Sequence, residues 1–203
     1  LVYLNQMPVN VEDLPARQTY VGSDERESGT FEMQEVCRQL GGQGEVSFLI
    51  GDLRTHAARQ RTLDYYQVLE TPECAGLTIL EARFAQWSFD QGKAVVAEWI
   101  AAGRLPQAIV ANNDDMALGA VAALAEAGVP DAQVLTAGVD ATAAALDSMA
   151  QGFLDVTVLQ NAKAQASAAI EAAVALSRGE SVASVVSVPL ELITPEAAAQ
   201  AAR

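Results

Sequence analysis

The sequence predicts an α/β protein with a doubly wound parallel sheet, and three observations support this fold class. Short apolar runs alternate with longer amphipathic, alanine-rich segments along most of the 203 residues. The apolar runs are nearly continuous, which is typical of parallel strands that helices cover on both faces. Glycine stops most of the amphipathic segments, among them those that end at Gly103, Gly128 and Gly152.

The first part of the chain is predicted to contain two short strands and a helix. Residues 1–4 are an apolar run followed by polar residues, and we expect a buried strand there. Two prolines favour a loop over residues 7–18. Residues 19–22 predict a second strand, and residues 25–40 predict a helix that two glycines stop.

Four strand–helix units are predicted next. Their helices carry apolar residues three or four positions apart, as Val95, Trp99 and Ala102 show. In the third unit, four consecutive polar residues, Asn112 to Asp115, lie between the strand and the helix. The predicted units are strand 46–50 with helix 55–69, strand 77–82 with a helix from Asp90 to 102, strand 108–111 with a helix to Gly128, and strand 134–137 with a helix to Gly152.

The last part of the chain repeats the same pattern once and then changes. A strand is predicted over residues 155–159, followed by a long alanine-rich helix over residues 163–178 that ends at Gly179. Strands at 185–188 and 190–193 flank Pro189. The tail, residues 196–203, reads as helical or frayed.

Polar and aromatic residues lie just past the ends of most predicted strands. Because the carboxyl ends of parallel strands meet at one edge of a sheet, we expect these residues to share that edge, where ligands bind in open α/β sheets. The set comprises Asp52, Trp87, Phe89, Asn113, Asp140 and Gln160.

This set matches the chemistry of a neutral polyhydroxylated ring. Asn offers donors and acceptors, Asp offers acceptors, and Arg offers a fork of donors. Each hydroxyl of such a ring both donates and accepts, while the C–H faces stack on aromatic side chains. Taken singly, each residue is better explained as a helix cap or a solvated loop residue, so the hypothesis depends on their repetition along one edge.

Composition excludes several classes of partner. The formal net charge of −14 argues against nucleic acid and anionic membranes, because like charges repel. No apolar run is long enough to span a bilayer. The only histidine, His56, rules out a histidine-rich metal site, and no cofactor motif occurs. We therefore expect no metal and no cofactor.

Charged residues near helix starts have competing interpretations. Asp114 and Asp115 would suit a paired-carboxylate site, but N-capping and the helix dipole explain both, and we favour that interpretation. Arg59 and Arg61 lie near the start of a helix, which is the end that disfavours cations. We predict a functional role for Arg61 and a solvent-exposed position for Arg59.

Cys37 and Cys74 are too few for a disulfide scaffold and form no C-x-x-C pair. We interpret them as two unpaired thiols packed as small hydrophobic residues, although one disulfide in an oxidising compartment is compatible with the sequence.

Taken together, several motifs resemble the type I periplasmic sugar-binding proteins of ABC importers, the ribose-binding-like group. They occur in family order, and the resemblance covers essentially the whole chain. The sequences of residues 49–53 and 154–165 are most similar to those of members that bind inositol or related cyclic polyols. The motifs are YVGSDERESG at 20–29, GDLRTHAARQRT at 51–62, AIVANNDDMALGAVAAL at 108–124, AGVDATAAAL at 137–146 and LDVTVLQNAKAQA at 154–166.

The resemblance implies a solute-binding protein rather than an enzyme. Such a protein has two lobes joined by three crossovers, holds a sugar or cyclic polyol in the cleft between them, and delivers it to a permease from the periplasm. The crossovers would fall near Ser23–Asp24, Gln160–Asn161 and Pro189. The implied ligand contacts are Asn5, Gln6, Ser23, Asp52, Arg61, Trp87 or Phe89, Asn113, Asp140 and Gln160.

The sequence departs from the family pattern in three ways. Asn5-Gln6 stands where many sugar binders have Asp-Arg, and Val139 stands where ribose binders often have an aromatic residue. The family's first strand–helix units do not precede Leu1. We therefore expect one complete lobe, residues 24–160 with 189–203, and a partial lobe, residues 1–23 with 161–188. Because a monomer rarely tolerates such an exposed apolar surface, we expect either that this is a truncated or clipped fragment or that partner chains cover the partial lobe.

Other proteins would show the same pattern in this window. The ligand-sensing effector domain of a LacI-type repressor shares the fold but requires a helix-turn-helix ahead of it, and a periplasmic sensor domain of a kinase would be indistinguishable. A phosphorelay receiver domain would need a lysine after the fifth strand, and none stands at a matching strand end.

Overall fold

The computed structural model describes residues 1–195, so the predicted tail at 196–203 lies outside the described residues. The chain divides into two compact units. The smaller unit comprises Leu1–Asp24 and Gln160–Leu190, and the larger unit comprises Glu25–Leu159 and the described residues from Glu191 to 195.

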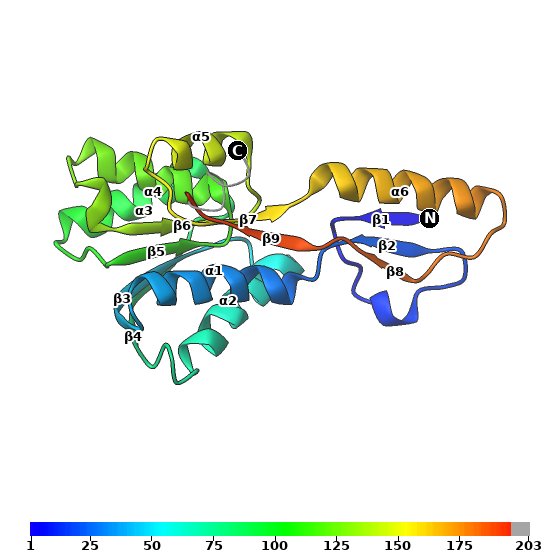
Figure 1. The fold of residues 1–203 in the computed structure, drawn as a ribbon, viewed down its shortest axis with the longest axis horizontal. Helices are drawn as coiled ribbons and strands as arrows, with labels where there is room; N and C mark the ends of the chain where they lie inside the picture. The colour runs from blue at the N-terminus through cyan, green and yellow to red at the C-terminus, as the bar shows by residue number, and fades with distance from the viewer. Residues whose placement is uncertain (196–203) are drawn as a thin grey trace. The chain divides into compact units, whose positions relative to one another are not determined.

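A parallel sheet forms the centre of the larger unit (Figure 1). Its strand order is β4-β3-β5-β6, and every neighbouring pair is parallel, which confirms the predicted fold class. Single parallel bridges join the end of β6 to the β7 segment, and β7 pairs with β9. The strands are β3 (Gln43–Ile50), β4 (Gly76–Phe84), β5 (Ala108–Ala111), β6 (Leu135–Ala137), β7 (Thr157–Gln160) and β9 (Leu190–Ile193).

Helices cover both faces of this sheet (Figure 1). The helices α1 (Glu25–Gln39) and α2 (His56–Leu69) pack on one face around a core that includes Phe48 and Tyr65. The helices α3 (Phe89–Ala101), α4 (Asp114–Glu126) and α5 (Ala143–Ala150) pack on the other face around Ile109 and Trp99. A short 3₁₀ turn, Asp131–Gln133, precedes β6. Strand β5 is buried along its whole length, which explains why its sequence is a continuous apolar run, as is typical of parallel strands covered on both faces.

The smaller unit has a three-stranded parallel sheet in the order β1-β2-β8. Its strands are β1 (Val2–Leu4), β2 (Thr19–Gly22) and β8 (Val185–Ser187), with a 3₁₀ turn at Val11–Asp13. Helix α6 (Ala162–Ser177) packs against β1 and β2, and Val21, Ala172 and Val188 form the small core.

The prediction that residues 1–4 form a buried strand is wrong in one respect. The strand is present, but Leu1 is 65% exposed and Leu4 is 45% exposed. The reason is that β1 is an edge strand among the described residues, with a neighbour only on its β2 side. An apolar run alone does not distinguish an edge strand from a central one.

The cysteines also differ from the favoured interpretation of unpaired thiols. Cys37, near the end of α1, and Cys74, just before β4, form a disulfide with a Cα–Cα distance of 5.8 Å. Both residues are buried at one end of the larger unit's core. The sequence left this pairing open because 37 positions separate the two residues.

Candidate functional site

The candidate site lies at the edge of the larger unit's sheet where β3, β4, β5 and β6 end. Backbone strain is concentrated there. Gln86 and Trp87, just after β4, have φ values of 50° and 64°, and Asp140 and Ala141, after β6, have φ values of 124° and 50°. A positive φ is unfavourable for residues with a Cβ, and such strain clusters where the surrounding structure fixes side chains for a purpose.

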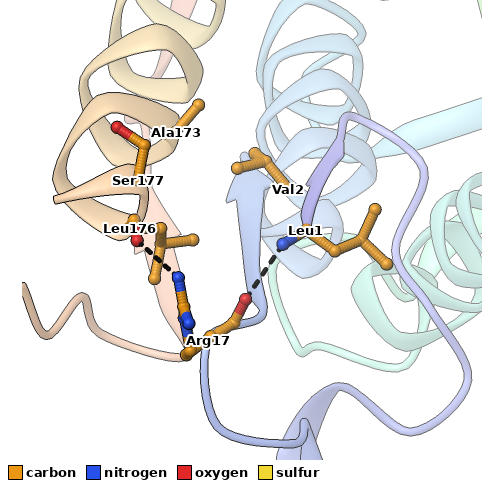
Figure 2. Close-up of a pocket in the computed structure, with 6 residues that line it drawn as sticks. All are labelled: Leu1, Val2, Arg17, Ala173, Leu176 and Ser177. Carbon is orange, nitrogen blue, oxygen red and sulfur yellow. Dashed lines mark hydrogen bonds between the residues drawn. The ribbon is translucent and has the colours of Figure 1, made fainter. Parts of the chain in front are cut away.

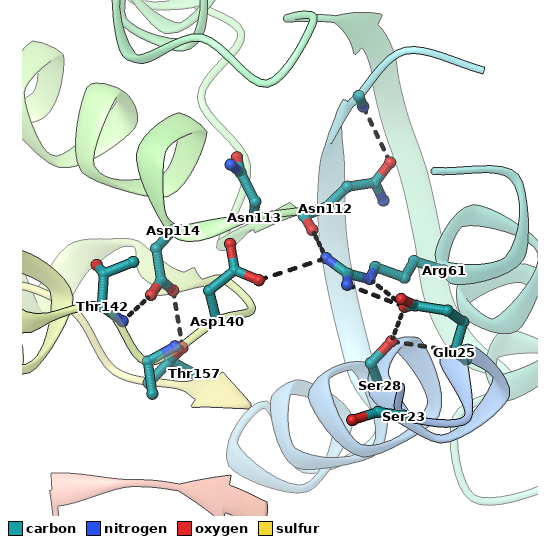
Figure 3. Close-up of polar contacts among 12 residues, drawn as sticks. Ser23, Glu25, Ser28, Arg61, Asn112, Asn113, Asp114, Asp140, Thr142 and Thr157 are labelled. Carbon is teal, nitrogen blue, oxygen red and sulfur yellow. Dashed lines mark hydrogen bonds and ion pairs between the residues drawn. The ribbon is translucent and has the colours of Figure 1, made fainter. Parts of the chain in front are cut away.

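Arg61 is the centre of the polar contacts at this edge (Figure 3). Its side chain projects from α2 and is only 3% exposed. Nε donates to Oε2 of Glu25 at 2.9 Å, and Nη1 donates to the carbonyl oxygen of Asn112 at 2.6 Å. Burial alone would lower the pKa of Arg61, but the charges of Glu25 and Asp140 raise it above its ordinary value, so the guanidinium stays charged.

Asp140 faces Arg61 from the end of β6 (Figure 3). Its Oδ1 lies 4.0 Å from Nη1 of Arg61, which is an ion pair but too long for a hydrogen bond. The side chain is 34% exposed, unlike that of Glu25 at 6%. Burial raises the pKa of Asp140 to about 7, with Arg61 opposing this shift and Asp114 and Glu25 adding to it.

Trp87 supplies the aromatic face beside the cluster. Its ring centroid lies 5.9 Å from Cζ of Arg61, within the range of a cation–π contact. The ring packs over the backbone of Gly51, where any side chain would collide with it. The lack of a side chain at Gly51, just after β3, therefore makes room for the Trp87 ring at this edge.

Asn112 and Asn113 are adjacent in sequence but have different roles. Asn112 is fully buried, and its Oδ1 accepts from the backbone N–H of Gly51 at 2.9 Å, which ties the ends of β3 and β5 together. Asn113 is the N-cap of α4, and its Oδ1 accepts from the backbone N–H of Met116 at 3.1 Å.

Asp114 does not cap the helix as predicted, because Asn113 occupies that position. Its buried carboxylate instead joins three segments (Figure 3). Oδ1 accepts from the hydroxyl of Thr157 and Oδ2 accepts from the backbone N–H of Thr142, both at 2.7 Å. Burial raises the pKa of Asp114 to about 6, and these hydrogen bonds oppose the shift. Asp115 is exposed in the first turn of α4, as the helix-dipole interpretation expects.

Two other predicted residues of the larger unit lie at the same edge without joining the cluster. The carboxylate of Asp52 forms an ion pair with Arg54 at 2.6 Å, and this contact lowers its pKa. Phe89 opens α3 and is 41% exposed. Arg59 is exposed and donates to the carbonyl oxygens of Leu53 and Arg54.

The smaller unit holds the other predicted residues. Asn5 and Gln6 are exposed after β1, and Asn5 has a φ of 62°. Ser23 is buried, and its hydroxyl accepts from Nε2 of Gln165 at 3.2 Å. Gln160 ends β7 and is half-buried. Their roles in binding stay predictions.

Two residues of the cluster were not predicted from the sequence as site residues. Glu25 neutralises Arg61, and Asn112 orients it through a backbone carbonyl. The only sequence signal for Glu25 is an acidic residue in a first helical turn, which ordinarily indicates a surface position. No pattern links it to an arginine 36 positions away.

A cavity of about 440 Å³ lies in the smaller unit and is not the candidate site (Figure 2). Its polar groups are already engaged with backbone. Nη2 of Arg17 donates to the carbonyl of Leu176, and the amino group of Leu1 donates to the carbonyl of Arg17. The cavity therefore offers no convergent polar groups of the kind that fix a small ligand.

Residues 1–195 contain no group of three His, Cys, Asp or Glu residues placed to hold a metal ion. None of the helices within that range combines the length and apolar character needed to cross a membrane.

Comparison with known proteins gives a consistent result. The family model described as periplasmic binding protein domain matches residues 9–181. A putative rhizopine-binding protein of Rhizobium meliloti is 43% identical over 96% of this chain, and a xylitol-binding protein of Mycolicibacterium smegmatis is 33% identical over 80% of it. The chain spans 63% and 46% of the lengths of these two relatives, respectively.

Solved structures show the same similarity. An ABC transporter solute-binding protein of Bacillus halodurans with bound myo-inositol superposes with a TM-score of 0.90 and 35% identity, covering 98% of this chain and 67% of that one. A periplasmic solute-binding protein of Actinobacillus succinogenes with bound D-allose gives 0.87 and 26%, covering 98% and 70%.

Proposed function

This chain belongs to the periplasmic binding protein domain family, and on that premise we propose that its protein captures a sugar or cyclic polyol and delivers it to an ABC importer. The proposed role is binding rather than catalysis, and the proposed location is the periplasm. The chain spans less than two-thirds of the length of its curated relatives, so these statements about the whole protein are proposals.

One observation carries the proposal. A half-buried carboxylate, Asp140, and an aromatic ring, Trp87, flank the same buried guanidinium at the carboxyl edge of the sheet. A carboxylate accepts from ring hydroxyls, and an indole face packs on ring C–H groups. This combination recognises a polyhydroxylated ring, and the relatives with bound myo-inositol and D-allose support that ligand class.

The predicted ligand residues of the larger unit differ in whether they contact the ligand directly or position another residue. Asp140 and the amide nitrogen of Asn113 contact ligand, since the Asn113 oxygen is occupied by its own helix. Trp87 or Phe89 stacks on it. Arg61 acts mainly by orienting Asp140, because Glu25 and Asn112 already engage its guanidinium.

The test is isothermal titration calorimetry on the protein that carries this chain, with myo-inositol, xylitol, D-ribose and D-allose. For each ligand that binds, Asp140→Ala and Asn113→Ala should raise Kd at least about tenfold, as expected for lost hydrogen bonds to charged or buried groups. Asp147→Ala, which removes an exposed carboxylate from α5, is the matched control. Unchanged affinity in both site variants would refute the site.

We also propose that the smaller unit self-associates. Leu1, Leu4, Ile170, Val174 and Val185 leave apolar side chains exposed on it, with exposed fractions from 42% to 66%. Exposed apolar side chains in this number on a small unit favour association. Light scattering over a range of concentrations checks this, and a monomer at all of them would contradict it.

A further inference from the structure

The backbone around Asp140 has an unfavourable conformation that neighbouring residues of the larger unit hold in place, and the inference drawn from them rests on the proposed function. Asp140 and Ala141 have φ values of 124° and 50°. Both residues carry a Cβ, so this conformation persists only where the surrounding groups stabilise it. The direction of the Asp140 carboxylate, toward Arg61, therefore depends on those groups.

Three consecutive backbone N–H groups of this segment donate to fixed acceptors. The N–H of Asp140 donates to a backbone carbonyl of β7 at 2.8 Å. The N–H of Ala141 donates to the hydroxyl oxygen of Thr157 at 3.1 Å. The N–H of Thr142 donates to Oδ2 of Asp114 at 2.7 Å. Two of these three acceptors are side chains, so a substitution can remove each of them separately.

The two side chains are also bonded to each other. The hydroxyl of Thr157 donates to Oδ1 of Asp114 at 2.7 Å (Figure 3). Because a hydroxyl has a single hydrogen, this bond leaves the oxygen of Thr157 free to accept from Ala141. Both side chains are fully buried, so bulk water does not compete for these hydrogen bonds.

Asp114 is held against the same segment by its backbone and by a glycine. Its backbone N–H donates to the carbonyl oxygen of Val139 at 2.8 Å. A Cβ at Gly138 would lie 2.7 Å from Oδ1 of Asp114, so the absence of a side chain there lets the carboxylate reach Thr157. The first residue of α4 and the first residue of β7 therefore hold residues 139–142 together.

We propose that Thr157 and Asp114 are positioning residues for ligand binding, which hold the carboxylate of Asp140 where a ligand can reach it. Neither contacts the ligand itself, since both side chains are buried and engaged with each other. Loss of the Thr157 hydroxyl leaves the N–H of Ala141 without its partner, and the strained segment can then relax. A carboxylate that is no longer preorganised must be ordered on binding, which lowers affinity.

Variants of Thr157 test whether the hydroxyl or the packing of this residue matters. Thr157→Val keeps the branched shape and removes the hydroxyl. Calorimetry on the protein that carries this chain should show Kd for each polyol that binds raised about fivefold, which corresponds to one hydrogen bond. Thr157→Ser keeps the hydroxyl and should restore most of the affinity.

A second variant and a control complete the series. Asp114→Asn keeps the shape but has one acceptor atom in place of two, and should weaken binding as Thr157→Val does. Thr136→Val is the matched control, because it also removes a buried hydroxyl of the larger unit, one that donates to the carbonyl oxygen of Phe153. Its Kd should stay near that of the wild type.

A further measurement requires no ligand. Native-state hydrogen exchange followed by NMR reports the protection of the Ala141 amide. This amide should lose protection in Thr157→Val and keep it in Thr157→Ser and Thr136→Val. Urea unfolding of the same variants checks that each is folded under the assay conditions.

The outcomes separate this inference from the function it rests on. If Asp140→Ala weakens binding while Thr157→Val and Asp114→Asn leave Kd unchanged, the inference is overturned and the proposed function stands. Equal losses of affinity in Thr157→Val and Thr157→Ser would also overturn it, because packing would then be the cause. If no polyol binds the wild type, the proposed function fails, and the Ala141 amide decides the inference: unchanged protection in Thr157→Val overturns it, and lost protection supports it.

Discussion

At the residue scale, the Arg61–Glu25 pair explains why the cluster can exist in a buried position. A buried guanidinium without a partner is strongly unfavourable, and so is a buried carboxylate. Each neutralises the other here at 2.9 Å. Ser28, one turn along α1, donates to the same Oε2 of Glu25 at 3.2 Å and fixes its orientation. Asp140 therefore lies beside an ion pair whose two charges already balance each other.

Asp140 should show the stability cost that a functional carboxylate imposes. Its folded-state pKa of about 7 lies above the ordinary value for Asp of about 3.9. The protonated form is therefore favoured by folding, and the stability that it contributes is present below about pH 4 and is lost as pH rises through about 7. We expect Asp140→Asn to be more stable than the wild type at pH 8, with this advantage gone at pH 4.

Urea unfolding at pH 4, 6 and 8 measures this difference directly. Asp147→Asn controls for the loss of one unit of charge on an exposed helix face. The four charged groups that act on Asp140 are Arg61, Asp114, Glu25 and Asp115, so the direction depends on burial outweighing Arg61. A difference between Asp140→Asn and wild type that is the same at pH 4 and pH 8 would contradict the account.

At the element scale, the disulfide holds the amino-terminal end of β4 to the end of α1. The cross-link closes a loop that contains β3 and α2, which carries Arg61. For a sequence separation of 37, the loss of chain entropy in the unfolded state amounts to about 4 kcal/mol. The bond therefore supports the elements that position the site, although it lies away from it.

Reduction of this bond should lower the free energy of unfolding by a few kcal/mol, up to that value of about 4. Urea unfolding with and without dithiothreitol measures the change. A Cys37→Ala/Cys74→Ala variant is the control, because reductant should leave its midpoint unmoved. The account fails if the wild-type midpoint is unchanged once mass spectrometry shows both thiols free.

The sequence predicted the elements better than the contacts between them. Apolar runs and glycine stops located the strands and helices, and the parallel fold class was confirmed. Asp140 was selected because it follows a strand end and Arg61 because it lies near a helix start, and the two side chains face each other. Glu25 was missed because its partner is 36 positions away, and Asp114 was assigned to a cap that Asn113 occupies. Hydrophobic periodicity indicates which face of a helix or strand is buried. It does not show which polar side chains contact one another.

At the scale of the whole molecule, the two units differ in how much core they contain. The larger unit has helices on both faces of its sheet and two clusters of buried residues, one on each face. The smaller unit has one cluster, centred on Val21, Ala172 and Val188. Local stability follows the apolar contacts that must be broken for an amide to open.

Hydrogen exchange should therefore divide the chain along the same boundary. Amides of β3 and β5, which are paired on both sides within the larger unit's sheet, should exchange slowest. Amides of β1 and β8, at the two edges of the smaller sheet, should exchange fastest among the strands, because within residues 1–195 each pairs with β2 alone. Mass spectrometry of native-state exchange makes this comparison, with β2 as the internal control.

The control separates two explanations of fast exchange. Strand β2 belongs to the same small unit but is fully buried and paired on both sides. If edge position is the cause, β2 should exchange more slowly than β1 and β8. If the thin core is the cause, all three should open together and exchange at similar rates. Protection of β1 and β8 equal to that of β5 would contradict both, and would mean that contacts beyond the small core hold this unit.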